Sequence, residues 1–159
     1  MITQQRLKAL VYYDNERGAL IRRRDRSYKK EGSALGGHDM KGYLKTCIDG
    51  KYYKVHRLVW LYEKGEFPRG ELDHINGVKD DNRLCNLRIA NHSENSQNQR
   101  RAQKHNKVGL LGVVKIRDKY KAMIRIDGKQ IKSCLFDDPI EAHNAYLKAK
   151  RIVHSHCTI

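Results

Sequence analysis

The feature that most constrains the fold is residues 71–99, in which two short apolar runs flank a turn-rich loop. The run Glu71–His74 predicts a short strand that ends in two adjacent ionisable residues. The run Leu87–Ala90 predicts the strand that returns beside it, and Asn76-Gly77 predicts a turn in the connection. These residues therefore predict a two-stranded unit with a long, polar connection.

A helix is expected directly after the returning strand. Ser93 is a typical N-cap residue, and Glu94 in the first turn would interact favourably with the helix dipole. A strand, a loop, a second strand and a helix in this order would bring three polar side chains towards one small site, namely His74, Asn86 and Asn95.

Further hairpins are expected on either side of this unit. Asp49-Gly50 and Asp127-Gly128 each lie between two β-rich runs, and Asp-Gly is typical of two-residue hairpin turns. A third hairpin is expected around Asn15–Gly18. After the Asp49-Gly50 hairpin, the apolar spacing of residues 56–64 predicts a helix that ends at Gly65.

A polar, basic stretch divides the chain into two modules. We expect a first module at residues 1–98, a linker at 99–108 and a second module at 109–159. The second module reads as three antiparallel strands followed by one helix, which Asp137 or Asp138 would cap. The predicted fold class is therefore α+β throughout.

The charge of the chain favours a polyanionic partner. The 159 residues contain 33 Lys and Arg but only 18 Asp and Glu, which gives a net charge of +15. Basic side chains bind phosphates with release of counterions, so nucleic acid is the expected partner. Charge alone does not distinguish DNA, RNA and an anionic membrane surface.

Several classes of protein are excluded by composition. No run approaches the roughly 20 apolar residues that span a bilayer, and the N-terminal residues MITQQRLKAL lack the apolar segment of a secretion signal. We therefore expect a cytoplasmic protein without a membrane partner. None of the cysteines forms a CxxC pair, which disfavours a structural zinc site and favours reduced thiols, at positions 47, 85, 134 and 157.

The residues of 71–99 suit phosphodiester hydrolysis. His74 can take a proton from water at neutral pH, which makes it the candidate general base. Asp73 and the side-chain oxygen of Asn95 are hard donors that suit Mg²⁺ or Mn²⁺, so one divalent cation per site is expected. Asn86 would orient the imidazole, and Asn82 competes with it for that role.

Four nearby side chains have open roles. His56 would pack or contact phosphate, and His92 would be a supplementary ligand or a phosphate contact. Arg83 and Arg88 would either clamp the scissile phosphate or face solvent, and we include both among the candidate DNA-binding residues.

The same residues resemble a known family. Asp73-His74, Asn86 and Asn95 look like the ββα-metal motif of HNH endonucleases, in the branch of phage-type homing endonucleases whose third letter is Asn. The words HRLVW, DHING, DNRLCNLR and SENSQN carry the likeness over about residues 40–100. The resemblance implies that His74 and Asn86 are catalytic, that Asp73 and Asn95 bind the metal, and that the chain acts in a bacterial host.

The second module resembles the AP2/ERF-type DNA-binding domain. The words GVVKIRDKYKAMIRIDGK and EAHNAYLKAK carry this likeness, which implies a sheet that enters the major groove. Alternation along 120–126 independently separates Ala122, Ile124 and Ile126 from a basic face. The candidate DNA-binding residues on or near that face are Lys115, Arg117, Lys119, Lys121, Arg125 and Lys132; alternatively, they only solvate a sheet edge.

These observations predict a metal-dependent HNH endonuclease that nicks or cuts duplex DNA, as a monomer or a homodimer. Two alternatives stay open at this point. One is a DNA-binding protein whose nuclease fold is catalytically silent, and the other is a basic RNA-binding protein.

Overall fold

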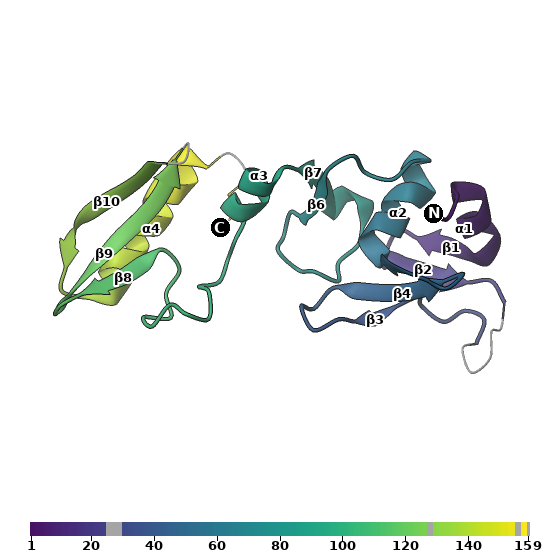
Figure 1. The fold of residues 1–159 in the computed structure, drawn as a ribbon, viewed down its shortest axis with the longest axis horizontal. Helices are drawn as coiled ribbons and strands as arrows, with labels where there is room; N and C mark the ends of the chain where they lie inside the picture. Colours follow the sequence, from purple (N-terminus) through teal and green to yellow (C-terminus); the bar gives the residue numbers. More distant parts are fainter. Residues whose placement is uncertain (25–29, 127–128, 155–156, 159) are drawn as a thin grey trace. The chain divides into compact units, whose positions relative to one another are not determined.

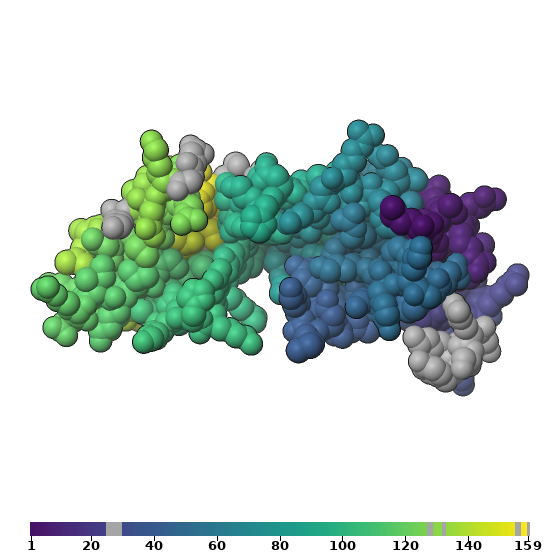
Figure 2. Space-filling model, viewed as in Figure 1, coloured from purple at the N-terminus to yellow at the C-terminus, as the bar shows by residue number. Residues whose placement is uncertain are grey.

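The computed structural model describes residues 1–24, 30–126, 129–154 and 157–158, except the side chain of Lys132. Contacts divide the chain into two compact units, residues 1–92 and residues 93–159. In Figures 1 and 2 the first unit runs from purple to teal and the second from green to yellow. The predicted boundaries at 98 and 109 stay a prediction; by contacts, Ser93 and the residues after it group with the second unit.

The first unit begins with a helix, two small antiparallel sheets and a second helix. Strand β1 pairs with β2, and β4 lies between β3 and β5. The hairpin predicted at Asp49-Gly50 is confirmed, since both residues have positive φ angles, 49° and 75°. The elements are α1 (Gln4–Leu10), β1 (Val11–Asp14), β2 (Ala19–Arg22), β3 (Gly37–His38), β4 (Leu44–Ile48), β5 (Lys51–Lys54) and α2 (Val55–Lys64).

Helix α2 forms the centre of the first core. It ends at Gly65, as predicted, and the φ of 82° at this glycine is the left-handed conformation common at helix ends. Its apolar face packs against side chains of α1, β1 and β2, and the most deeply buried members are Leu7, Val11, Leu20, Val55, Leu58 and Val59. The sequence analysis had not predicted α1, which begins after Thr3, whose hydroxyl accepts from the Arg6 amide.

The two predicted strands of 71–99 form as expected. Strand β6 (Glu71–His74) pairs antiparallel with β7 (Leu87–Ala90), and the short 3₁₀ helix η1 (Leu84–Asn86) precedes β7. Helix α3 (His92–Gln97) follows. The prediction that Ser93 caps this helix is wrong, because α3 begins at His92 and Ser93 therefore lies in its first turn.

The second unit is a three-stranded antiparallel sheet with one long helix, as predicted. The strands are β8 (Val113–Ile116), β9 (Lys119–Ile126) and β10 (Lys129–Phe136), with β9 in the middle. Helix α4 (Pro139–Val153) lies along one face of the sheet (Figure 1), where Tyr146 packs on Ala122 and Ile124. Asp138 caps it by accepting from two backbone amides. The predicted turn Asp127-Gly128 lies outside the described residues. None of the described helices is long and apolar enough to cross a membrane.

A glycine at the start of β8 fixes how closely α4 approaches the sheet. Gly112 has a φ of 74°, and a Cβ there would overlap the ring of Tyr146. Gly109 has the same φ but open space around it.

We therefore expect Gly112→Ala to lower the stability of the second unit by about 1–3 kcal/mol more than Gly109→Ala does, because only Gly112→Ala adds overpacking to backbone strain. Hydrogen exchange of the β8–β10 amides measures this; equal protection in the two variants would contradict the contact.

Candidate active site

Asp73 and His74 are the last two residues of β6, and both are buried. Adjacent residues of a strand point to opposite faces, so the two side chains meet different surroundings. Asp73 pairs across the ladder with Arg88, whereas His74 pairs with Leu87 and points into a cluster of aromatic rings. The site is therefore assembled around one strand end.

The His74 ring is oriented by a hydrogen bond to Asn82. Its Nε2 lies 3.1 Å from Asn82 Oδ1, and Asn82 is fully buried. Asn82 Oδ1 can accept a hydrogen bond from Nε2–H, and in that tautomer Nδ1 keeps its lone pair. Burial lowers the pKa of His74, opposed by the bond to Asn82 and by the charge of Asp73. The neutral imidazole that a general base requires is therefore favoured at neutral pH.

Two aromatic residues pack against the imidazole. The rings of His56 and Tyr43 have their centroids 5.1 Å and 5.8 Å from that of His74. Burial, followed by the proximity of His74, lowers the pKa of His56 to about 3, so His56 is neutral and adds no charge beside the site. The ammonium groups of Lys54 and Lys79 lie over the Tyr43 ring, at 4.1 Å and 5.1 Å. The cluster thus combines neutral rings with nearby positive charge.

Asn86 shapes the loop that carries Asn82. Its Oδ1 accepts from the Asn76 amide at 2.9 Å, and its Nδ2 donates to Asn76 Oδ1 at 3.0 Å and to the Asp81 carbonyl at 2.8 Å. These bonds join the two ends of the loop between β6 and β7. Of the two amides considered from the sequence, Asn82 bonds the imidazole and Asn86 holds the loop.

The N-terminal hairpin supports the same loop from outside. The hydroxyl of Tyr13 donates to the Asn82 carbonyl at 3.2 Å and accepts from the Leu84 amide at 3.0 Å. At the hairpin turn, Gly18 lies so close to the backbone of Asn82 and Arg83 that a Cβ there would overlap it. Sequence analysis missed both contacts, because nothing local links residue 13 to residue 82.

The carboxylate of Asp73 is bound by Arg88. Both Nε and Nη2 of Arg88 donate to Asp73 Oδ2, at 3.0 Å and 2.7 Å. The Asp73 side chain is 7% exposed and that of Arg88 is 22% exposed, so the pair is well shielded from water. Arg88 therefore does not simply face solvent, and its predicted contact with DNA stays a prediction.

Arg83 is also paired, but at the surface. Its Nε and Nη2 donate to the two carboxylate oxygens of Asp81, at 2.8 Å and 2.6 Å, and this lowers the pKa of Asp81 to about 2. The loop carboxylate stays ionised at neutral pH. Nearly half of the Arg83 side chain is exposed, and its predicted role in DNA binding stays a prediction.

The predicted metal ligand Asn95 lies on α3, which groups with the second unit, whereas Asp73 lies in the first. The segment after α3 is bound within its own unit, since Lys150 Nζ donates to the Gln99 carbonyl at 2.6 Å. Among the described residues, no group of three or more His, Cys, Asp or Glu could hold a metal ion. That finding does not test the predicted pair, which has one carboxylate and one amide. The Nδ1 atom of His92, the possible extra ligand, lies 3.7 Å from Glu71 Oε1.

Lys121 and Arg125 follow the predicted alternation, whereas Lys115 pairs with Tyr120 and so shares the opposite face, that of Ala122 and Ile124. Lys121 and Arg125 alternate with the buried Ala122 and Ile124, so they lie on the face opposite α4. Lys119 is paired with Asp137 at 3.0 Å, and the Lys115 ammonium lies 6.0 Å from the Tyr120 ring. Arg117 stands in the turn between β8 and β9 with a φ of 53°. The side chain of Lys132 lies outside what the structure describes.

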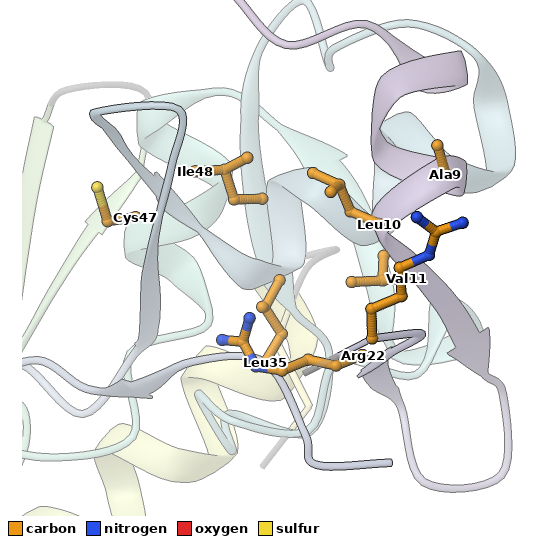
Figure 3. Close-up of a pocket in the computed structure, with 8 residues that line it drawn as sticks. Ala9, Leu10, Val11, Arg22, Leu35, Cys47 and Ile48 are labelled. Atoms are coloured by element: carbon orange, nitrogen blue, oxygen red, sulfur yellow. The ribbon is translucent and has the colours of Figure 1, made fainter. Parts of the chain in front are cut away.

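A cavity of about 180 Å³ lies elsewhere in the first unit (Figure 3). Side chains from α1, β1, β2 and β4 surround it, together with Leu35 and Arg24. None of the predicted site residues lines this cavity.

Residues 53–97 match the family model described as HNH endonuclease. This stretch contains α2, β6, the loop, β7 and α3, and it confirms the predicted resemblance for that segment. The resemblance of residues 109–159 to AP2/ERF domains stays a prediction.

Two further similarities extend beyond this segment. The chain is 31% identical over 86 residues to the SPbeta prophage-derived putative HNH homing endonuclease YosQ of Bacillus subtilis (strain 168). The match covers 54% of this chain and spans half the length of that relative. A structure titled "DNA binding and cleavage by the HNH homing endonuclease I-HmuI" aligns with 91% of this chain and 87% of its own, at 22% identity and a TM-score of 0.41. A TM-score this low does not establish a common fold.

The buried, neutral state of His56 makes the first unit sensitive to acid. The unfolded chain protonates this residue near pH 6.5, whereas the folded chain does so only near pH 3. Between these values the unfolded state binds more protons, so the free energy of unfolding falls as the pH falls. From pH 7 to pH 5 the loss is about 2 kcal/mol, and His56→Gln is expected to remove it.

Urea unfolding followed by Trp60 fluorescence measures this effect, because the only tryptophan packs on the core of the first unit. Val78→Gln, which changes an exposed side chain of the same unit that has no titratable group, should keep the pH dependence of the wild type. The same slope in wild type and His56→Gln would show that His56 is not buried in its neutral form.

Proposed function

We propose that this chain is a metal-dependent endonuclease that hydrolyses phosphodiester bonds in duplex DNA, of the phage homing-endonuclease type. The observation that carries the proposal is the pair Asp73-His74 at the end of β6, with the imidazole hydrogen-bonded to Asn82. The match of residues 53–97 to HNH endonucleases and the basic net charge support it. A cytoplasmic location, in a bacterial host, belongs to the same proposal.

His74 would act as the general base through Nδ1. With its proton on Nε2, donated to Asn82, the imidazole offers Nδ1 to a water molecule beside the scissile phosphate. Asn86 acts on the reaction by holding the loop that carries Asn82. The neutral His56 and Tyr43 keep the ring from turning away, because they pack against it.

The donors at hand fit a hard divalent cation. A carboxylate oxygen of Asp73 and the amide oxygen of Asn95 are the ligand types that Mg²⁺ and Mn²⁺ prefer, and they would hold one ion. When bound, the ion would neutralise charge on the phosphate and the departing oxygen. The contact between Arg88 and Oδ2 would keep the Asp73 carboxylate fixed in direction.

The second unit would supply DNA affinity and site selection. The sheet face opposite α4 carries Lys121 and Arg125, and a sheet with such a face resembles the AP2/ERF-type domains that enter the major groove. Arg117 and Arg125 are the better candidates for base contacts, because a guanidinium can pair bidentately with guanine, and the lysines suit phosphates.

Removing the base should stop the chemistry without affecting DNA binding. We expect the wild type to nick or cut plasmid DNA in Mg²⁺ or Mn²⁺, and His74→Ala to be slower by about 10²–10⁴-fold. His105→Ala, which changes an exposed histidine outside the site, should cleave at the wild-type rate. Agarose gels measure cleavage, and gel shifts in EDTA measure binding.

Each rival function has a distinct result in this experiment. Equal cleavage by wild type and His74→Ala would exclude His74 as the base. Binding of duplex DNA without cleavage by the wild type would indicate a silent nuclease fold. Tighter binding of structured RNA than of duplex DNA would indicate an RNA-binding protein.

The positive φ of Arg117 predicts that replacing this residue by Asn changes DNA binding but does not destabilise the second unit. A non-glycine residue in this conformation costs about 1 kcal/mol, so Arg117→Asn should not destabilise the second unit, because Asn tolerates it better. DNA binding should weaken by about 1–3 kcal/mol if the guanidinium contacts a base. Lys148→Asn, which removes the same charge from the exposed side of α4, is the control. Equal affinities of the two variants in gel shifts would exclude a special role for Arg117.

A further inference from the structure

The sheet face opposite α4 carries apolar side chains as well as basic ones. Directly opposed residues of neighbouring strands share a face, and Lys121 of β9 is paired with Val114 on one side and with Leu135 on the other. The three strands thus present a row in which one cation stands between two aliphatic side chains. One step along the sheet, Ile116 is paired with Lys119.

These aliphatic side chains do not belong to the core of the second unit. Leu135 is 49% exposed and Ile116 is 41% exposed, although the residues that alternate with Lys121 on β9 are buried under α4. An irregularity in the pairing between Lys132 and Leu135 separates the two ends of β10. Beyond it, Leu135 stands directly opposite Lys121, on the exposed face.

The composition of this face selects one kind of partner. Its described outward positions on β8 and β9 include Lys119, Lys121 and Arg125 and no acidic residue, and Asp137, after β10, pairs with Lys119 at 3.0 Å. The cations favour a polyanion, while the aliphatic groups need apolar surface in the same place. The major groove of DNA offers both, because phosphates line its edges and each thymine exposes a methyl group in it.

We propose that Leu135 and Ile116 contact thymine methyl groups in the major groove and thereby make this unit prefer thymine at the positions they reach. The inference rests on the proposed DNA binding by this sheet face and goes beyond it. Phosphate contacts by the lysines would fix the register of the protein but read no sequence. The aliphatic residues would then set part of the specificity.

The test removes only the methyl group. The full chain, in EDTA to prevent cleavage, is used to select tight-binding duplexes from a random-sequence pool. The selected duplexes are then resynthesised with deoxyuridine in place of thymidine, which deletes the methyl and leaves pairing intact. We expect the wild type to bind the deoxyuridine duplex about fourfold more weakly for each methyl contacted, since burying one such group contributes about that much.

Two variants and a matched control assign the effect to this face. Leu135→Ser and Ile116→Ser should each bring the ratio of the two dissociation constants closer to one, because the side chain that senses the methyl is gone. Ile131→Ser is the control, since Ile131 is 50% exposed but is paired with the buried Ile124 on the other face. It should keep the wild-type ratio.

The outcomes separate the inference from the proposed function. Equal binding of thymine and uracil duplexes by the wild type, or an unchanged ratio in both variants, would overturn the methyl contact while leaving DNA binding intact. No binding to either duplex would overturn the proposed function as well. A change of oligomeric state in Leu135→Ser, with an unchanged ratio, would identify the face as a contact between two copies of the chain.

Discussion

The buried hydrogen bond between His74 Nε2 and Asn82 Oδ1 is the interaction on which the candidate site depends. It fixes the direction of the ring and favours the tautomer with the proton on Nε2. A single hydrogen bond to a flexible loop would not hold the His74 ring in one orientation, so the loop that carries Asn82 must itself be rigid. Asn86 closes the loop across its base and Tyr13 holds its far end, which leaves Asn82 little freedom. The N-terminal hairpin is in this sense part of the site.

Charge in the buried part of the site is arranged so that little of it is uncompensated. Asp73 has a guanidinium on one oxygen, and His56 is neutral because protonation would place a charge among buried rings. The loop carboxylate Asp81 lies nearer the surface and is neutralised by Arg83. A buried imidazole and a carboxylate paired with a guanidinium can therefore stand next to each other on one strand.

The sequence was most informative where local patterns decide the structure. The bounds of β6 and β7 were predicted to the residue, because short apolar runs between turn residues leave few alternatives. Helix α1 was missed because its seven residues bury mainly Leu7 and show no clear period. Asn86 was predicted to orient His74, with Asn82 as its competitor, and Asn82 is the residue that bonds the imidazole. The answer depends on loop geometry that Tyr13 fixes from about seventy residues away, a long-range contact without a local signal.

The pairing of Arg88 with Asp73 limits what Arg88 can do in a DNA complex. Two of its five N–H donors are on Oδ2, and taking one partner away from a shielded ion pair costs about 3–5 kcal/mol. One phosphate contact by Arg88 would not offset that cost, because many other basic side chains of the chain can bind phosphate. If Arg88 reaches DNA, it must do so with its other donors while still holding Asp73. It would then link the carboxylate to the phosphate backbone, and a lysine, with its single ammonium, could not replace it in that role.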